Sequence, residues 1–237
     1  LERRNWVLSR MLKNDFIEYD TYKLEIKKPI NYNIKKYASN FTSDYYLEEI
    51  RRKVIELFSE EDLYGGGLSI RTSLDTTSQS IAIHSLKNGL KSYDKRHGYR
   101  GVITNYDQDD WLDYAKKNIK IPQDYFFARV KKFIGNDVII ETDNSKLDGN
   151  KILLFENYKW ARKFISDYYI GPKITNPKDV FKLNDIIYIS IAEDKIIRLE
   201  QIPKINGAIV VMDPYSGRVL ALSGGFDFKL SNFNRAS

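Results

Sequence analysis

Two unbroken apolar runs near the end of the chain constrain the fold more than any other feature: residues 208–212 and residues 218–222. Between them lie residues that favour a tight turn, so the pattern predicts a β-hairpin: Asp213, Pro214, Ser216 and Gly217. Neither run alternates with polar residues, which indicates cover on both faces, as at the centre of a sheet with helices packed on it. Residues 226–237 contain no helix-length apolar pattern that could provide this cover. We therefore expect the chain to hold only the start of the domain to which the hairpin belongs.

The composition is that of a globular protein, since 42% of the 237 residues are hydrophobic and 14% are aromatic. The absence of cysteine excludes disulfides and thiolate metal sites, and it leaves the redox compartment open. The net charge of +6 permits attraction to nucleic acid, anionic lipid or an acidic polymer, but 38 basic against 32 acidic residues favours a mixed, solvated surface. The longest apolar run is far shorter than the roughly 20 residues of a membrane helix. We expect any membrane anchor to lie outside this sequence.

The first 30 residues have the pattern of two short helices. Apolar residues recur at four-residue spacing over residues 2–13, which predicts a helix with Trp6 packed inward. Asp20 is placed to cap a second helix that ends before Pro29. The Asn- and Lys-rich residues 31–40 then have the composition of a linker.

The next section predicts helix, strand and helix. A helix begins at Ser43 or Asp44 and carries an apolar stripe formed by Leu47, Ile50, Val54 and Leu57. Glycines at 65–67 form a turn, after which residues 68–74 alternate with the period of a half-buried strand. Asp75 caps a longer helix whose buried face is predicted to contain Ala82, Ile83, Leu86, Gly89 and Leu90.

The middle of the chain, residues 101–202, has the pattern of short strands separated by turns. The predicted strands are residues 125–134, 138–141, 151–155, 185–191 and 195–199. Turns are expected at 135–136, 148–149 and 193–194. Five strands in about a hundred residues suit a small oligonucleotide/oligosaccharide-binding (OB) type barrel.

Several ordered blocks resemble the class A penicillin-binding proteins, the bifunctional peptidoglycan synthases of the bacterial cell wall. Residues 201–225, QIPKINGAIVVMDPYSGRVLALSGG, followed by Phe226 and by residues 233–236, look like the opening of the family's transpeptidase domain. Residues 3–11, RRNWVLSRM, resemble the close of its glycosyltransferase domain. The blocks YYLEEIRRKV, LYGGGLSIRTSLDTTSQSIAIHSL and YDKRHGYRG are similar to family segments in the same order. Residues 160–162 and 179–188 resemble the OB-like insert between the two catalytic domains.

The resemblance implies an α+β chain with four parts. These are the end of a glycosyltransferase domain at 1–30, an interdomain linker with helices and one strand at 31–100, a five-stranded OB-like domain at 101–203, and the truncated start of a transpeptidase domain at 204–237. The parent would polymerise lipid-linked disaccharide-peptides and cross-link their stem peptides, anchored in the bacterial inner membrane with this region on the periplasmic side. This region would act as an interdomain scaffold and docking surface, since in some family members the equivalent domain meets an outer-membrane lipoprotein activator.

The resemblance places both catalytic centres outside the chain, so we expect no catalytic, cofactor-binding or metal site here and no cofactor. The family's serine lies in a Ser-x-x-Lys motif and is assisted by Ser-x-Asn and Lys-Thr-Gly. One Ser-x-x-Lys occurs, at Ser92 to Lys95, but neither partner motif appears, so Ser92 is interpreted as a chance match. Only His84 and His97 are present, so no pair of histidines in a zinc motif can form. His84 is interpreted as solvated or packed on a helix surface. His97 lies in a basic turn, residues 95–100, that either is structural or contacts a polyanion or a lipid headgroup.

An alternative from a different class is a single-stranded nucleic-acid-binding module. An OB-like barrel with a basic isoelectric point fits such a module if its aromatic side chains stack bases: Tyr125, Phe126, Phe127 and Trp160. The flanking blocks favour the synthase interpretation, and we expect no nucleic-acid partner. The expected partners are the other domains of the same chain, a cell-envelope activator, and either a second copy or the chain's own linker helices against the exposed hairpin.

Overall fold

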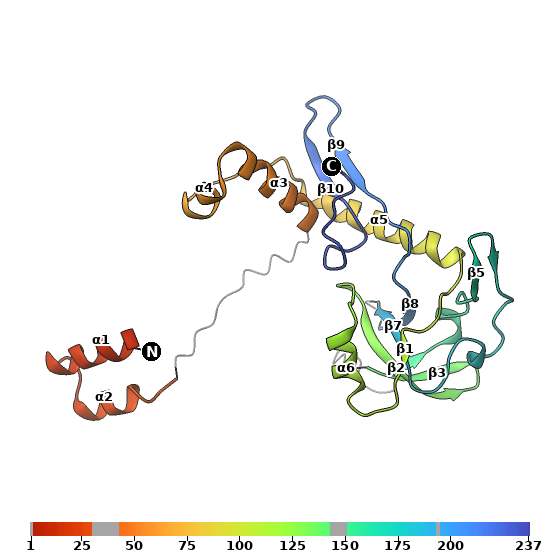
Figure 1. Cartoon of the computed structure of the whole chain (residues 1–237), viewed down its shortest axis with the longest axis horizontal. Coiled ribbons are helices and arrows are strands. Elements are labelled where there is room, and N and C mark those ends of the chain that lie inside the picture. The colour runs from red at the N-terminus through yellow and green to blue at the C-terminus, as the bar shows by residue number, and fades with distance from the viewer. Residues whose placement is uncertain (1, 30–42, 143–150, 193–194) are drawn as a thin grey trace. The chain divides into compact units, whose positions relative to one another are not determined.

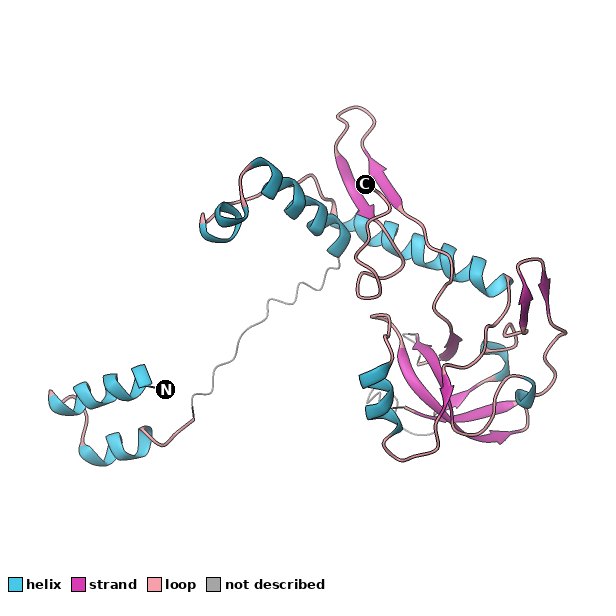
Figure 2. Ribbon diagram, in the orientation of Figure 1, coloured by secondary structure: helices cyan, strands magenta, loops and turns pink. Residues whose placement is uncertain are grey.

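The computed structural model describes residues 2–29, 43–142, 151–192 and 195–237. The chain divides into two compact units, residues 1–40 and residues 41–237, which are described separately. The linker predicted at residues 31–40 and the turns predicted at 148–149 and 193–194 lie outside the described residues. Figure 1 shows the order of the elements along the chain, and Figure 2 shows their types.

The first unit is a pair of helices, α1 (Glu2–Lys13) and α2 (Tyr19–Glu25). Both were predicted. The Arg4 side chain joins them by donating to the carbonyl of Ile26 at 2.9 Å. The inward packing of Trp6 was wrong, because the ring is 51% exposed and the Arg3 and Arg10 guanidinium groups lie over it at 5.0 and 5.4 Å. The cap was also wrong, because Asp20 lies inside the first turn of α2 and not at its N-cap.

The second unit begins with α3 (Asp44–Leu57) and α4 (Glu60–Gly65). Ser43 is the N-cap of α3, as predicted, although its side chain makes no capping bond. The predicted apolar stripe is only partly correct, because Leu47 and Leu57 are 53% and 74% exposed. The buried face of the helix is set instead by Tyr45 and Tyr46, which pack against the hairpin.

The strand predicted at residues 68–74 does not form. Its apolar side chains Leu68 and Ile70 are exposed, and only the last residues of the segment reach the hairpin. There the Ser73 hydroxyl donates to the carbonyl of Val219 at 2.7 Å. Alternating polarity makes a strand only where a neighbouring strand supplies a ladder, and this segment meets a strand edge at its end alone.

The long helix α5 (Thr76–Arg96) packs against a hairpin formed by β9 (Ile209–Met212) and β10 (Val219–Ser223). Both the helix and the hairpin were predicted. The Asp75 carboxylate caps α5, as expected, by accepting from the Ser78 amide at 2.7 Å. Ala82 and Leu90 are buried, whereas Gly89 is exposed, so the buried face of α5 is narrower than predicted.

Cover of the hairpin on both faces is not found within the described residues. The end of β10 is buried, and α3 and α5 both contact it. Val210 and Met212 of β9 remain 45% and 56% exposed. The chain's own helices therefore provide part of the cover that the apolar runs require.

The middle of the second unit is a curled antiparallel sheet in which β4 also lies beside β8. Its strands, in the order β1-β7-β2-β3-β4 with β8 also on β7, are β1 (Thr104–Asn105), β2 (Phe126–Ile134), β3 (Asp137–Glu141), β4 (Ile152–Leu153), β7 (Asp185–Ile191) and β8 (Ile197–Glu200). All five predicted strands are present, and the β2–β3 turn has Gly135 at a φ of 57°. The prediction of five strands missed β1, which has two residues and no apolar run around it.

Short helices and a second hairpin complete this region. They are α6 (Trp111–Asn118), η1 (Phe155–Asn157), η2 (Pro177–Asp179), β5 (Phe164–Ser166) and β6 (Tyr169–Ile170). None was predicted. Trp111 and Ala115 of α6 pack on Phe127 and Ile186 of the sheet. The main core is a separate cluster on the sheet, which includes Val130, Leu153, Tyr158, Phe181, Ile187 and Leu199. The fold is a mixture of helix and antiparallel sheet, as the sequence indicated.

Candidate functional site

The Ser-x-x-Lys sequence is not arranged as a nucleophile with its base. Ser92 is exposed near the end of α5. Lys95 turns towards the sheet, where its ammonium group lies 3.0 Å from the Glu200 carboxylate and donates to the carbonyl of Leu199 at 3.3 Å. The lysine is therefore held by a carboxylate and a carbonyl of β8.

The two histidines make local contacts. The Nδ1 atom of His84 lies 2.8 Å from the carbonyl of Ser80 on the exposed side of α5. His97 ends the helix, with its Nδ1 atom 2.8 Å from the carbonyl of Tyr93 and its ring stacked on the tyrosine at 4.2 Å. No group of three His, Asp or Glu side chains that could hold a metal ion occurs among the described residues.

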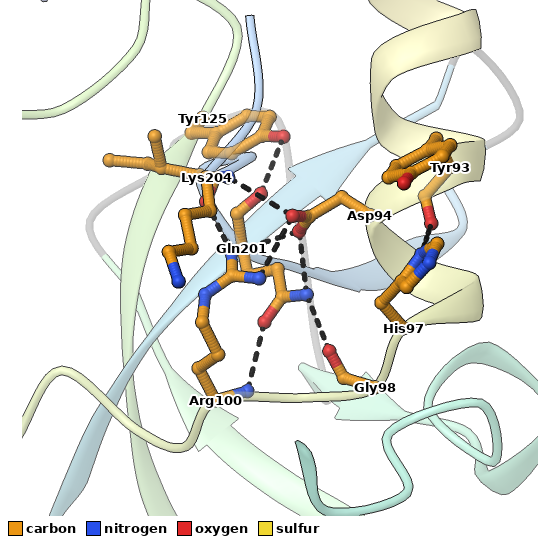
Figure 3. A network of polar contacts seen from close by, with 9 residues as sticks. Tyr93, Asp94, His97, Gly98, Arg100, Tyr125, Gln201 and Lys204 are labelled. Atoms are coloured by element: carbon orange, nitrogen blue, oxygen red, sulfur yellow. Dashed lines mark hydrogen bonds and ion pairs between the residues drawn. The ribbon is translucent and has the colours of Figure 1, made fainter. Parts of the chain in front are cut away.

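The most extensive polar cluster that the structure brings together surrounds Asp94, in the last turns of α5 (Figure 3). Its carboxylate is buried and accepts two parallel hydrogen bonds from the Arg100 guanidinium, both of 2.8 Å. It also accepts from the Gln201 side-chain amide at 2.7 Å and from the Lys204 backbone amide at 3.0 Å. Bidentate Arg–carboxylate pairs are among the strongest polar contacts in proteins. We call these four residues the Asp94 cluster.

Gln201 connects the Asp94 cluster to the loop that follows α5. Its side-chain oxygen accepts from the Arg100 amide at 3.1 Å, and its side-chain nitrogen donates to the carbonyl of Gly98 at 2.9 Å. Gly98 has a φ of 96°, and a Cβ there would lie 2.9 Å from the carbonyl oxygen of Arg162. The loop that enters the sheet and the segment that leaves it are therefore held to the same helix end.

Three lysines on one side of α5 add ion pairs between the helix and the OB-like region. Lys87 pairs with Asp124 at 2.6 Å, while Lys91 and Lys95 approach the buried carboxylate of Glu200 at 3.8 and 3.0 Å. Burial lowers the pKa of Lys91, while the nearby Glu200 carboxylate opposes this effect. The spacing of four residues places all three side chains on one helix face.

An apolar contact joins the helix, the sheet and the chain after the hairpin. Leu90 of α5, Tyr125 before β2 and Phe226 after β10 form one buried cluster. Next to it, the Asp227 carboxylate accepts from the Gln123 amide at 2.9 Å. Burial, together with the Glu200 carboxylate, raises the pKa of Tyr125.

The other end of α5 is bonded to the hairpin through Gln79. This side chain is 1% exposed, donates to the carbonyl of Leu222 at 2.8 Å and accepts from the Leu222 amide at 2.8 Å. The Asp75 amide donates to the carbonyl of Leu220 at 2.9 Å. Gln79 thus occupies the edge of β10 in the way that a neighbouring strand would.

The aromatic residues considered for base stacking are packed within the protein. Tyr125 and Phe127 are each 3% exposed, and Phe126 packs on the main core. Trp160 is partly buried, with the Lys95 ammonium 4.8 Å from its ring centroid and the Tyr99 ring edge-on to it. Two of these four rings are therefore buried and the other two are packed against the main core, an arrangement that does not favour base stacking.

The blocks that contain Gln79 and Asp94 were recognised in the sequence, but the hydrogen-bond partners of these two side chains were not predicted. The signal available was their place beside helix ends, where polar side chains satisfy backbone groups. Gln201 carried no such signal, because its partners lie about a hundred residues away in the chain.

Comparison with known proteins gives three findings. The family model described as "Penicillin-binding protein OB-like domain" matches residues 99–205. Penicillin-binding protein 1A of Rickettsia typhi is 37% identical over 240 residues, and that of Pseudomonas aeruginosa is 32% identical over 240 residues. These alignments cover 99% of this chain but 29% and 28% of the relatives, so the chain spans less than a third of their length.

A solved structure is similar over the whole chain. The crystal structure of penicillin-binding protein 1A from Haemophilus influenzae matches with a TM-score of 0.70 and 27% identity. The match covers 100% of this chain and 33% of that protein. The structure thus agrees with the sequence comparisons. Among the described residues, no helix has the length and apolar character needed to cross a membrane.

Proposed function

We propose that this chain, which belongs to the class A penicillin-binding proteins, is the connecting region of a bacterial peptidoglycan synthase and acts as an interdomain scaffold. The parent would polymerise glycan strands from lipid-linked precursors and cross-link their stem peptides on the periplasmic side of the inner membrane. The names of the relatives and the OB-like family model support this proposal.

One observation carries the scaffold role. The helix α5 is bonded to β10 through Gln79 and to both ends of the OB-like region through Asp94. In the proposed division, residues 1–30 end the glycosyltransferase domain, residues 31–100 connect, residues 101–203 form the OB-like domain and residues 204–237 begin the transpeptidase domain. The helix would then hold the OB-like domain and the first transpeptidase strands in one arrangement.

The chain by itself is proposed to lack both activities, because it aligns with less than a third of the length of the relatives that are named penicillin-binding protein 1A. Treatment with a fluorescent penicillin tests this. We expect no covalent label on the 237-residue chain, while the full-length protein of Pseudomonas aeruginosa, as a control, is labelled. Penicillin-blocked labelling that disappears in Ser92→Ala would overturn the proposal and make Ser92 a nucleophile.

The OB-like domain is also proposed as a docking surface for a cell-envelope activator protein. The hairpin β5–β6 supports this. At its base the Gly171 amide donates to the carbonyl of Lys163 at 2.7 Å, and the Phe164 amide donates to that of Tyr99 at 2.9 Å. Beyond this base Ile165, Tyr168 and Tyr169 are 61%, 92% and 70% exposed. Exposed tyrosines on a fixed backbone are common anchors at protein interfaces. Titration of purified outer-membrane lipoproteins of Pseudomonas aeruginosa, the source of a similar protein, against the chain and against Tyr168→Ala checks the surface. Equal binding of both forms would exclude this hairpin.

A further inference from the structure

The helix α5 is bound at two separated points by buried polar side chains. Near its start, Gln79 makes paired hydrogen bonds of 2.8 Å with the backbone of Leu222. Near its end, Asp94 accepts four hydrogen bonds in the Asp94 cluster. The two positions are 15 residues apart (94 minus 79), which is about 22 Å along a helix that rises about 1.5 Å per residue.

The helix between these points is continuous. It has no proline and a single glycine, Gly89, and it runs without a break from Thr76 to Arg96. Neither end can separate from its partner without leaving a buried amide or carboxylate unpaired, which is unfavourable. A shift of one end along the helix axis is therefore carried to the other end.

We infer that α5 is a rigid coupling element, so that the state of the OB-like domain at Asp94 determines how firmly β10 is held at Gln79. This inference rests on the proposed scaffold function and adds a route of regulation to it. A ligand or partner that alters the OB-like domain near Gln201 would change how firmly the first strands of the proposed transpeptidase domain are held. The physical coupling itself is a property of this chain and does not require the proposed activity.

The coupling has a second route that the experiment separates. Phe226 packs on Tyr125, and Asp227 accepts from Gln123, so the segment after β10 also touches the OB-like domain directly. These contacts involve neither Gln79 nor Asp94. Loosening of α5 in its middle affects the first route and leaves the Asp227–Gln123 bond of the second route intact, whereas Leu90 of α5 belongs to the same apolar cluster as Phe226 and Tyr125.

The test is backbone amide exchange at Leu222, whose N–H is bonded to Gln79. In Asp94→Asn the carboxylate charge and its bidentate pairing with Arg100 are lost, and we expect Leu222 to exchange about tenfold faster, as for loss of hydrogen bonds to a buried charge. Glu141→Gln is the matched control. It also removes an acid–arginine pair, to Arg129 at 2.9 Å, but lies away from α5 and leaves Leu222 unchanged.

A second variant identifies the route. Asn88→Gly places two glycines in sequence in the middle of α5, at exposed positions, and we expect the additional effect of Asp94→Asn on Leu222 to shrink in that background. An equal effect in both backgrounds would overturn the helix as the coupling element, as would faster exchange confined to residues 93–100 and 201–204. If circular dichroism shows that Asp94→Asn unfolds the chain, Arg100→Lys is measured by the same criterion.

Failure of this inference and failure of the proposed function are distinguishable. Amide exchange reports on the helix without reference to penicillin or glycan. A chain that transmits the change but is labelled by penicillin contradicts the proposed function alone, whereas an unlabelled chain without transmission contradicts the coupling alone.

Discussion

The side chains of Asp94 and Gln201, which are 107 positions apart in the sequence, meet at 2.7 Å where α5 ends (Figure 3). Gln201 follows the last strand of the OB-like region, and Asp94 precedes the loop that enters it. The buried Gln201 side chain, together with the Arg100 side chain and the Lys204 amide, therefore joins both ends of this region to the helix. We therefore expect the stability of the second unit to depend on the Gln201 side chain.

We expect Gln201→Ala to lower the free energy of unfolding by about 1–3 kcal/mol, because it removes the side-chain bonds to Asp94 and to the backbone of Gly98 and Arg100 and leaves the buried Gly98 carbonyl without this donor. Urea denaturation followed by circular dichroism measures the change. Gln123→Ala, an exposed glutamine of the same region, is the control and should stay within about 0.5 kcal/mol of the original chain. Equal midpoints for the two variants would contradict the structural role of Gln201.

Phe226→Ala should destabilise the contact between helix, sheet and hairpin. The Phe226 side chain is 4% exposed and packs on Leu90 and Tyr125, and truncation of a buried phenylalanine typically costs about 3–5 kcal/mol. Thermal unfolding provides the measurement, with Phe233→Ala as the matched control because that ring is 68% exposed. A loss for Phe226→Ala no larger than that for the control would show that the three elements do not share a core.

Gly98→Ala should be destabilising for two independent reasons. Its φ of 96° is unfavourable for a residue with a Cβ, and that Cβ would meet the backbone of Arg162 and Phe164 at 2.9 and 3.0 Å. We expect a loss of more than about 1 kcal/mol. Gly65→Ala is the control, since a Cβ there meets nothing within 4 Å. Unfolding of the two alanine variants at the same denaturant concentration would contradict the close approach of the Arg162 and Phe164 backbone to Gly98.

Alkaline pH should unfold the OB-like region through its buried tyrosines. Burial raises the pKa of Tyr158 from its ordinary value of 10.0 to about 12, and it raises the pKa values of Tyr99 and Tyr125 as well. A raised folded-state pKa contributes stability that is complete below pH 10.0 and is lost as the pH rises through the folded value.

Tyrosinate absorbance and circular dichroism recorded on the same alkaline titration give the check. Exposed tyrosines ionise first, and the buried ones ionise together with the loss of structure. Tyr158→Phe, which removes one of the buried tyrosines, should reduce only the second phase. Full ionisation of every tyrosine near pH 10.0, with the structure retained, would contradict the burial of Tyr158.

Oligonucleotide binding should be weak and unspecific, because the rings proposed to stack bases are covered by other side chains. A titration of single-stranded DNA at several salt concentrations measures it. In a Trp6→Phe background, used because Trp6 is 51% exposed, we expect little change in the fluorescence of Trp111, which is 3% exposed, and of Trp160, whose ring contacts Lys95 and Tyr99. Tight binding with a steep negative dependence on salt, lost in Trp160→Ala, would restore the nucleic-acid-binding alternative.

Local patterns in the sequence determined those elements that have a period and an end signal. The apolar runs at 208–212 and 218–222 predicted the hairpin, Asp75 predicted the start of α5, and short segments separated by turns predicted five of the strands of the sheet. Each of these depends on neighbours within a few residues, because side-chain direction repeats every 2 or 3.6 residues. The blocks that resemble penicillin-binding proteins identified the family for the same reason, since they are contiguous in the chain.

Tertiary structure decided which of these surfaces became interior. Residues 68–74 have a strand pattern but no strand beside them, and Leu57 belongs to an apolar stripe yet remains exposed. Gln79, Asp94 and Gln201 became buried polar contacts because the chain brings distant segments to the two ends of one helix. No local period records such a pairing, since its partners are set by how the helix packs against the hairpin and the sheet.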